Sequence, residues 1–288
     1  MAGLKEIKRR LQSVRNTRQI TRAMKLVSAA KLSRAQEAAV RARLYVDALN
    51  DLMSSLLGEI GDEISHPLME ARETVKNVAL LVVGGSRGLC GPFNANINKA
   101  VEEFYSSKEG VVIKTIAVGK KPVEFFKRKG IDVVSAYDAL PEDPNKWPLL
   151  EISQILEGRY LEGDVDEAYL IYTKFKSVLS QQVVTKKILP FEMAIDTPSA
   201  QQGATLFEPS PKDVFDGIIP RLMRVNIHQA FLESKASEHG SRMTAMDSAT
   251  KNAGELIDKL QLLHNRLRQG GITSELLDIV GGVEALNQ

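Results

Sequence analysis

The sequence of residues 4–57 is LKEIKRRLQSVRNTRQITRAMKLVSAAKLSRAQEAAVRARLYVDALNDLMSSLL, which contains neither glycine nor proline. Its apolar residues recur at spacings of three, four and seven, which is the period of one helix face. They include Leu4, Ile7, Leu11, Val14, Ile20, Met24, Val27, Val46, Leu49, Met53, Leu56 and, just beyond, Ile60. At about 1.5 Å per residue, an uninterrupted helix here is roughly 80 Å long. We therefore predict an N-terminal helical segment over residues 1–62, longer than most globular domains can bury.

A comparable helical pattern occupies the other end of the chain, residues 209–288. It follows Pro209 and Pro211, and Ser210 is suited to cap a helix that has Pro211 at its first position. Its apolar positions are Ile218, Leu222, Val225, Leu232, Met243, Met246, Ala249, Ala253, Leu256, Leu260, Leu263, Leu267, Leu277 and Val280. Two such helices can bury their apolar faces against each other, so we predict a long antiparallel coiled coil.

Small and flexible residues dominate the predicted contact layer of this coiled coil, which would let the helix axes approach closely. They are Ala23, Met24, Ala29, Ala30, Ala35, Ala38 and Ala39 on one side, and Met243, Ala245, Met246 and Ala249 on the other. An ordinary helical bundle is the alternative. It requires a third and a fourth long helix, for which the sequence offers no candidate.

The pattern between the helical ends, over residues 75–195, changes to short apolar runs that alternate with helical segments. Strands are predicted at 78–83, 112–118, 133–134 and 168–172, and helices near 94–105, 120–129 and 149–162. Loops are expected at 143–148 and 196–203, the second of which leads to the C-terminal helix. This alternation predicts an α/β fold class for the centre of the chain, a small, mostly parallel Rossmann-like domain.

Composition and charge exclude several classes of protein. The 288 residues include 38 Lys and Arg, 36 Asp and Glu and a single cysteine, Cys90, so a disulfide-stapled secreted module is excluded. The longest apolar run, Val78 to Val83, is far shorter than the ~18 residues of a membrane span. Residues 1–34 carry ten basic side chains against one acid, Glu6. An Arg-rich start also resembles a mitochondrial transit peptide, although the helical pattern continues far beyond any cleavage point.

No residue pattern indicates an active site, a metal centre or a cofactor. The turn GGSRGLCG at residues 84–91 precedes a helix, yet its spacing fits neither the dinucleotide-binding nor the P-loop fingerprint, which favours tight packing or a subunit contact. His66, His228, His239 and His264 match no metal-ligand spacing. Nucleic acid is an improbable partner because residues 1–44 contain no aromatic side chain that could stack on a base. The basic helix is better suited to an acidic protein partner.

Three motifs resemble the gamma subunit family of the F-type, proton-translocating ATP synthase of bacteria. Residues 4–11 (LKEIKRRL) and 16–31 (NTRQITRAMKLVSAAK) are similar to its N-terminal shaft helix, RGLCG at 87–91 to a turn of its central domain, and ITSELLDIVGG at 272–282 to its C-terminal signature. Ser86 stands where the family usually has an acid, and Val283 where it usually has Ala. The cysteine-bearing insertion of plant members is missing, which argues against dithiol regulation. The resemblance covers essentially the whole chain, with the motifs in the family's order.

The resemblance implies a central rotor shaft that couples proton flow to ATP synthesis or hydrolysis. In this family the coiled coil stands within three alpha and three beta subunits, and the central domain lies below it, beside epsilon and the membrane c-ring. ATP, ADP and Mg bind alpha and beta, so the shaft itself has no catalytic site, metal or cofactor and does not span the membrane. Because no transit segment precedes the first motif, we expect the cytoplasmic face of a bacterial inner membrane.

The resemblance also implies three groups of functional residues. The contacts with acidic loops of beta are expected at Met24, Lys25, Lys31, Arg34, Arg242 and Gln269. The bearing end is expected at Ile272, Leu276, Ile279 and Val280, and a turn facing the foot and epsilon at Arg87, Gly88, Leu89, Cys90 and Gly91. The alternative function is a free-standing coiled-coil adaptor with a ligand-binding α/β domain, which should be folded and soluble alone, whereas a shaft should need its surrounding ring.

Overall fold

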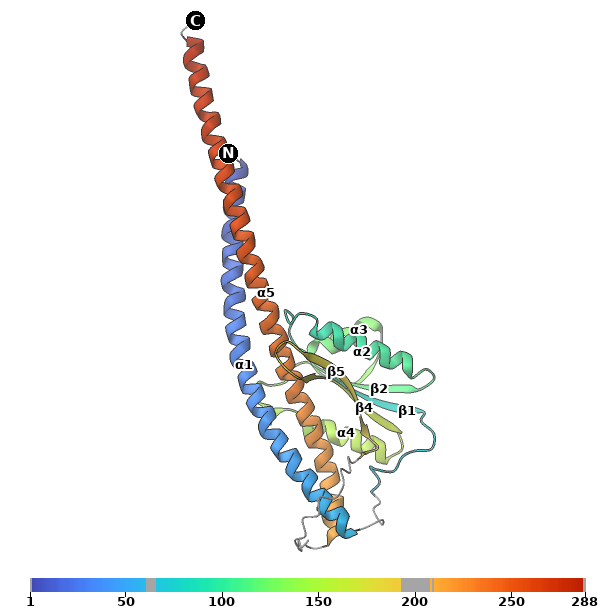
Figure 1. Ribbon diagram of the computed structural model, residues 1–288. Helices are drawn as coiled ribbons and strands as arrows, with labels where there is room; N and C mark the ends of the chain where they lie inside the picture. The colour runs from blue at the N-terminus through green and yellow to red at the C-terminus, as the bar shows by residue number, and fades with distance from the viewer. Residues whose placement is uncertain (1, 61–65, 193–207, 209, 287–288) are drawn as a thin grey trace. The chain divides into compact units, whose positions relative to one another are not determined.

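The computed structural model describes residues 2–60, 66–192, 208 and 210–286. Its longest helices are α1 (Ala2–Ile60) and α5 (Pro211–Leu286), and the strands and shorter helices lie between them in sequence (Figure 1). The chain divides into two compact units, one of residues 1–28 with 243–288 and one of residues 29–242. Each long helix contributes a part to each unit. The predicted domain limits 1–62, 75–195 and 209–288 follow the secondary structure elements instead, and they stay a prediction.

In the unit of residues 1–28 and 243–288, the two helix segments run antiparallel. Arg15 donates a hydrogen bond to Gln261 over 3.3 Å, Thr250 Oγ1 donates to Thr21 Oγ1 over 2.8 Å, and Lys25 Nζ lies 2.6 Å from Asp247 Oδ1. Residue numbers therefore rise along α1 as those of its partners fall along α5, which confirms the predicted antiparallel pairing. Among the residues of this unit whose burial is described, the buried ones are Leu11, Thr21, Ser28, Met246, Ala253, Ile257 and Leu260.

The composition of this seam differs from the predicted alanine-rich layer. Ala23 is exposed and Met24 is half-buried, whereas Thr21 and Ser28 are buried. Residues 21 and 28 are seven apart and therefore share one face, while residue 23 is rotated about 200° away from residue 21. A small hydroxyl can lie in this seam because the Thr21–Thr250 hydrogen bond satisfies it.

The unit of residues 29–242 is built on a five-stranded sheet. Its strands are β1 (Asn77–Val83), β2 (Val112–Val118), β3 (Val133–Tyr137), β4 (Glu167–Phe175) and β5 (Gln181–Leu189), in the order β3-β2-β1-β4-β5. The first four strands are parallel, as predicted, and β5 pairs antiparallel with β4. Strand β5 was not among the predicted strands, because its residues QQVVTKKIL lie half-exposed at the sheet edge and show no clear apolar pattern.

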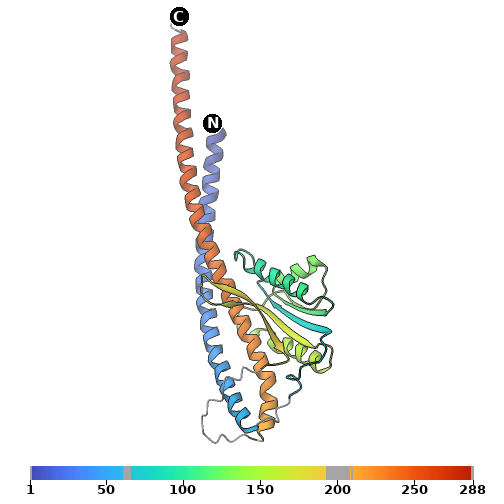
Figure 2. The ribbon, with the colours of Figure 1, turned by 45° about the vertical axis from the view of Figure 1, so that its right-hand side comes forward.

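Helices cover both faces of this sheet. Val78, Leu80 and Val82 of β1 pack toward α2 (Phe93–Ser107) and α3 (Lys120–Lys129). The alternating residues Ala79, Leu81 and Val83 pack toward α4 (Leu149–Leu161) and toward the parts of α1 and α5 within this unit. Figure 2 shows α2 and α3 on one side of the sheet and α4 on the other. Burial on both faces explains why β1 is a continuous apolar run in the sequence.

The start of α5 agrees with the predicted cap. Ser210 Oγ accepts a hydrogen bond from the Asp213 backbone N–H over 3.2 Å and donates to Asp213 Oδ2 over 2.6 Å, with Pro211 at the first helical position. Of the two predicted loops, 143–148 contains a short 3-10 turn, η1 (Pro144–Lys146), and 196–203 lies outside the described residues.

A proline inside α5 is compensated by a histidine from outside the helix. Pro220 has no backbone N–H, so the carbonyl of Asp216, four residues earlier, loses its intrahelical donor. The buried His66 ring donates a hydrogen bond to that carbonyl. Its Nδ1 accepts from the Leu68 backbone N–H over 3.1 Å, which leaves Nε2–H as the donor. The helix can therefore continue through Pro220.

Candidate protein-interaction site

Lys25 forms an ion pair within the chain. Its ammonium lies 2.6 Å from Asp247 Oδ1, and Lys251 lies 3.0 Å from Asp247 Oδ2. These two cations hold the pKa of the Asp247 carboxyl below its usual value, Lys25 having the larger effect. Met24 beside it is half-buried. Since the side chain of Lys25 is 40% exposed, the pair stands at the surface, where ion pairs are weak.

Lys31 of α1 is also paired within its own unit. Its Nζ forms an ion pair with Glu142, on the segment between β3 and α4. Glu142 is 78% exposed, whereas the side chain of Lys31 is 31% exposed. Arg34, one turn further along α1, is exposed. Two of the three α1 cations expected to face a partner are therefore already matched with a carboxylate of this chain.

The RGLCG turn has a strained but well-anchored backbone. Leu89 is a non-glycine residue at φ 59°, and Gly91 follows at φ 56°. Asn94 holds the turn, because its Oδ1 accepts from Gly85 N over 3.0 Å and its Nδ2 donates to the Arg87 carbonyl over 3.4 Å. Cys90 is buried, which raises the pKa of its thiol. The turn exposes Arg87 and 63% of Leu89 while the thiol packs inward.

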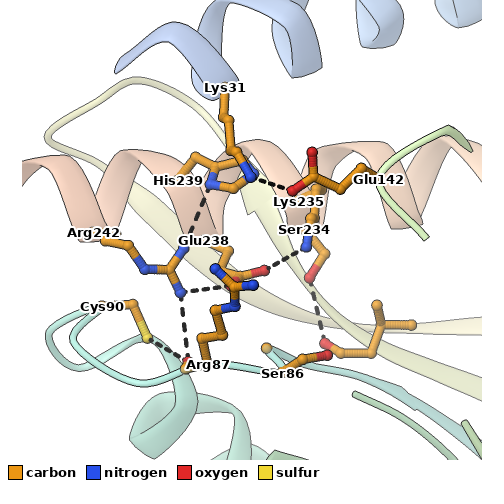
Figure 3. Close-up of polar contacts among 12 residues, drawn as sticks. Lys31, Ser86, Arg87, Cys90, Glu142, Ser234, Lys235, Glu238, His239 and Arg242 are labelled. Atoms are coloured by element: carbon orange, nitrogen blue, oxygen red, sulfur yellow. Dashed lines mark hydrogen bonds and ion pairs between the residues drawn. The ribbon is translucent and has the colours of Figure 1, made fainter. Parts of the chain in front are cut away.

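Arg242, expected to contact beta, is buried in this chain. It is only 7% exposed, and its guanidinium lies 2.6 Å from the Glu238 carboxylate and within 3.5 Å of the Gly88 and Arg87 carbonyls (Figure 3). Arg242 of α5 thus links the helix to the RGLCG turn. All of these contacts lie within the unit of residues 29–242, and the expected contact of Arg242 with beta stays a prediction.

The charges beside Arg242 are unusual for their burial. Glu238 is 4% exposed, and although burial opposes its ionisation, Lys235 and Arg242 keep the pKa of its carboxyl below the usual value. His239 is 8% exposed, and burial lowers its pKa to about 4. Its Nδ1 lies 3.4 Å from Arg242 Nη1. Since an arginine nitrogen can only donate, Nδ1 of the neutral ring is the acceptor in this contact.

The RGLCG turn contacts α5 at Arg242. This residue lies 31 residues after Pro211 and therefore about 45 Å further along the helix. The expectation that Arg87 to Gly91 face the foot and epsilon stays a prediction. Adjacent parallel strands end at this edge of the sheet, and the sequence motif alone did not reveal which part of α5 that edge approaches.

The expected bearing residues lie near the end of α5 and are largely exposed. Ile272, Leu276 and Ile279 are 50%, 57% and 63% exposed, and Gln269 is exposed as well. Val280 belongs to the helix, but its side chain lies outside the described part of the chain. The three exposed side chains form an apolar helix surface that this chain leaves open to water.

The glycine-rich edge of the sheet is occupied by close backbone packing. A Cβ at Gly119, where φ is +100°, would overlap the carbonyl oxygen of Gly84, and a Cβ at Gly84 would meet the Pro122 ring. Within residues 2–60, 66–192, 208 and 210–286, no three His, Cys, Asp or Glu side chains gather as metal ligands would. None of the helices described here combines the length and apolarity of a membrane span.

Sequence reasoning missed the carboxylates that bind the predicted cations. They are Glu142, Glu238 and Asp247. One signal was available, since Glu238 and Arg242 are four residues apart on a predicted helix. The partners of Lys25 and Lys31 lie more than a hundred residues away in the sequence, and no local spacing points to them.

The chain is similar to known proteins over nearly its whole length. A protein-family model described as ATP synthase matches residues 3–286. The chain is 42% identical over 287 residues to the ATP synthase gamma chain of Desulforamulus reducens, with 99% of this chain and 100% of the relative covered. It is 40% identical over 295 residues to that of Bdellovibrio bacteriovorus, with 99% of each covered. These matches define a subunit of the ATP synthase class.

Within that class, the chain belongs to the ATP synthase gamma chain family. Its fold is similar to the rotor of the Euglena gracilis mitochondrial ATP synthase, with a TM-score of 0.64 at 16% identity over 94% of this chain and 99% of that chain. The predicted fold class, a coiled coil with a central α/β domain, is confirmed. The comparisons also bear out the rotor-shaft function over the alternative of a free-standing adaptor.

Proposed function

We propose that this chain turns within a ring of three alpha and three beta subunits, with epsilon and the membrane c-ring at its foot. ATP is then made or hydrolysed on beta, and ATP, ADP and Mg bind alpha and beta, so the chain has no catalytic site of its own. The different faces of the turning shaft shift each beta subunit among states of different nucleotide affinity. The complex works at the cytoplasmic face of a bacterial inner membrane, where this chain is peripheral.

The exposed apolar surface of the long helices is the observation that carries this proposal. In the unit of residues 1–28 and 243–288, large apolar side chains are at least half exposed on both helix segments. They are Ile20, Leu26, Val27, Leu262, Ile272, Leu276, Leu277 and Ile279. Such a density of exposed apolar residues is typical of a surface that another protein covers. A surrounding ring of subunits meets that need, whereas a free-standing adaptor does not.

The cations support contacts with acidic segments of beta. Lys25 and Arg34 reach the surface, and Lys31 is partly accessible. Contacts that must break as the shaft turns should be weak, and exposed ion pairs, worth about 0–1 kcal/mol each, meet that requirement. Epsilon and the c-ring are assigned to the foot through the family resemblance.

Co-expression with cognate alpha and beta subunits tests the assembly. Size exclusion should yield a stable complex with three alpha subunits, three beta subunits and one copy of this chain. Its ATPase activity should depend on this chain. If a cognate alpha and beta pair assembles no complex with it, the shaft proposal is rejected.

Alanine at Lys25, Lys31 and Arg34 together tests the contact residues. ATP-driven proton pumping per ATP hydrolysed should fall severalfold, since three cation contacts of about 0–1 kcal/mol are lost, while the fold is kept. The matched control is alanine at Lys99, Lys120 and Lys127, which are exposed lysines of α2 and α3. Unchanged pumping in the variant with alanine at Lys25, Lys31 and Arg34 would contradict the proposed contacts of these residues with beta.

A further inference from the structure

Glu142 is an exposed carboxylate on a firmly anchored segment. The segment of residues 138–147 joins β3 to α4, and Ser86 Oγ donates to the Asp138 carbonyl at its start over 3.1 Å. At its end the Trp147 indole N–H donates to the Pro141 carbonyl over 2.8 Å. The Trp147 ring is 6% exposed and packs edge-on against His228. The position of Glu142 is therefore fixed although its side chain is 78% exposed.

Cations from three different elements face this single carboxylate. Lys31 of α1 binds it directly, and Lys235 of α5 and Arg87 of the RGLCG turn lie near enough to act on it (Figure 3). Lys31 is the main reason that the pKa of the Glu142 carboxyl is lowered. Lys235 also lies 3.1 Å from Glu238, which Arg242 binds as well. Positive charge thus exceeds negative charge around Glu142.

Of the carboxylates Glu142 and Glu238, only Glu142 can separate from its cation at a low cost in free energy. The side chain of Glu238 is buried, so its separation from Arg242 would leave a buried charge without that cation. Glu142 is open to water, so it can be hydrated when its ion pair opens. Lys31 can therefore leave Glu142 for another carboxylate, while the Arg242–Glu238 pair stays closed.

We propose that Glu142 is an internal competitor, which holds Lys31 until an acidic segment of the surrounding ring replaces it. The inference rests on the proposed function, because it needs such a segment to reach Lys31. Each replacement exchanges one exposed ion pair for another, so the number of ion pairs does not change. A contact of this kind can form and release repeatedly as the shaft turns, because neither state leaves Lys31 without a partner.

Removal of the competitor should make the contact tighter, not weaker. In the assembled complex, Glu142→Gln keeps the size of the side chain and removes its charge, so Lys31 should leave the partner carboxylate more slowly. We expect ATP turnover to fall about two- to fivefold at low salt and to recover at high salt, where surface charges are screened. Lys31→Gln with Glu142→Gln should behave as Lys31→Gln alone. Glu103→Gln, which opens the exposed Lys99–Glu103 pair on α2, is the matched control.

Other results would contradict either the competition alone or the proposed contact of Lys31 as well. If Lys31→Gln lowers pumping per ATP but Glu142→Gln has no effect on turnover, or lowers pumping in the same way, Glu142 does not compete and the inference alone is wrong. If Lys31→Gln leaves pumping unchanged, no acidic segment uses Lys31, and the contact in the proposed function is rejected together with the inference. Salt-reversible slowing that persists in the double variant also overturns the competition, because it would not depend on Lys31.

Discussion

Arg242 and Glu238 bury opposite charges one helical turn apart. Both side chains are less than a tenth exposed, and Arg242 also reaches the carbonyls of the RGLCG turn. A buried ion pair contributes little net stability, but the loss of one partner leaves the other charge uncompensated. The Arg242–Glu238 pair therefore acts as a fixed link between the RGLCG turn and α5.

Arg242→Gln should lower the free energy of unfolding by about 3 kcal/mol, because Glu238 then stays buried with Lys235 as its remaining cation. Glu238→Gln combined with Arg242→Gln should cost clearly less than Arg242→Gln. Urea denaturation followed by circular dichroism measures both. Equal losses in the two variants would show that the guanidinium stabilises the turn through its carbonyl contacts instead.

His239 makes stability depend on pH. Burial lowers its pKa from 6.5 to about 4, so folding excludes a proton that the unfolded chain takes up. The stability it contributes is complete above pH 6.5 and is lost as the pH falls through the interval from 6.5 to 4, by roughly 3 kcal/mol at most. Urea denaturation across this interval should show the loss. His239→Gln should flatten this part of the profile, and an unchanged slope would mean that other groups cause it.

At the scale of elements, α5 continues through Pro220 because His66 supplies the hydrogen bond that the proline cannot. The donor comes from the chain that follows α1, so the course of one element depends on a residue of another. A sequence pattern predicts that a proline ends or kinks a helix at this point. The local rule fails here because the freed carbonyl has a partner from outside the helix.

His66→Ala should destabilise the chain by about 1–3 kcal/mol, since the carbonyl of Asp216 then has neither the ring nor a helical N–H as its donor. Pro220→Ala restores a helical N–H to that carbonyl, so the same histidine change should cost less in that background. A double-mutant cycle of urea unfolding measures the coupling. Additive effects would show that the two residues act independently.

At the scale of the whole molecule, the exposed apolar face near the end of α5 should matter for assembly and not for the fold of the chain. Leu276→Ser with Ile279→Ser should leave the thermal unfolding of the chain nearly unchanged, because both side chains are more than half exposed. The same variant should weaken assembly with alpha and beta by tenfold or more, since two apolar side chains are then missing from the proposed contact with the ring.

Leu161→Ser with Leu179→Ser is the matched control for this prediction, because both leucines are exposed and belong to the other unit. Analytical size exclusion of the co-expressed subunits compares the two variants. Equal recovery of the complex with either variant would contradict a bearing role for the end of α5.

Most of the fold was predictable from local patterns, because long helices and buried strands leave a period in the sequence. The helical period of residues 4–57, without glycine or proline, predicted a helix, and the apolar run from Val78 to Val83 predicted a buried strand. Ser210 and Pro211 marked the start of α5. The half-exposed strand β5 carried no such period and was missed.

The sequence alone established the helices, the parallel strands, the family and the cationic character of the shaft. It could not establish which cations are free, because ion pairs such as Lys31–Glu142 join residues more than a hundred positions apart. The burial of Arg242 and the place of the RGLCG turn along α5 likewise emerged only from the folded chain. Local periodicity depends on neighbouring residues, whereas charge pairing and burial depend on which distant segments the fold brings together.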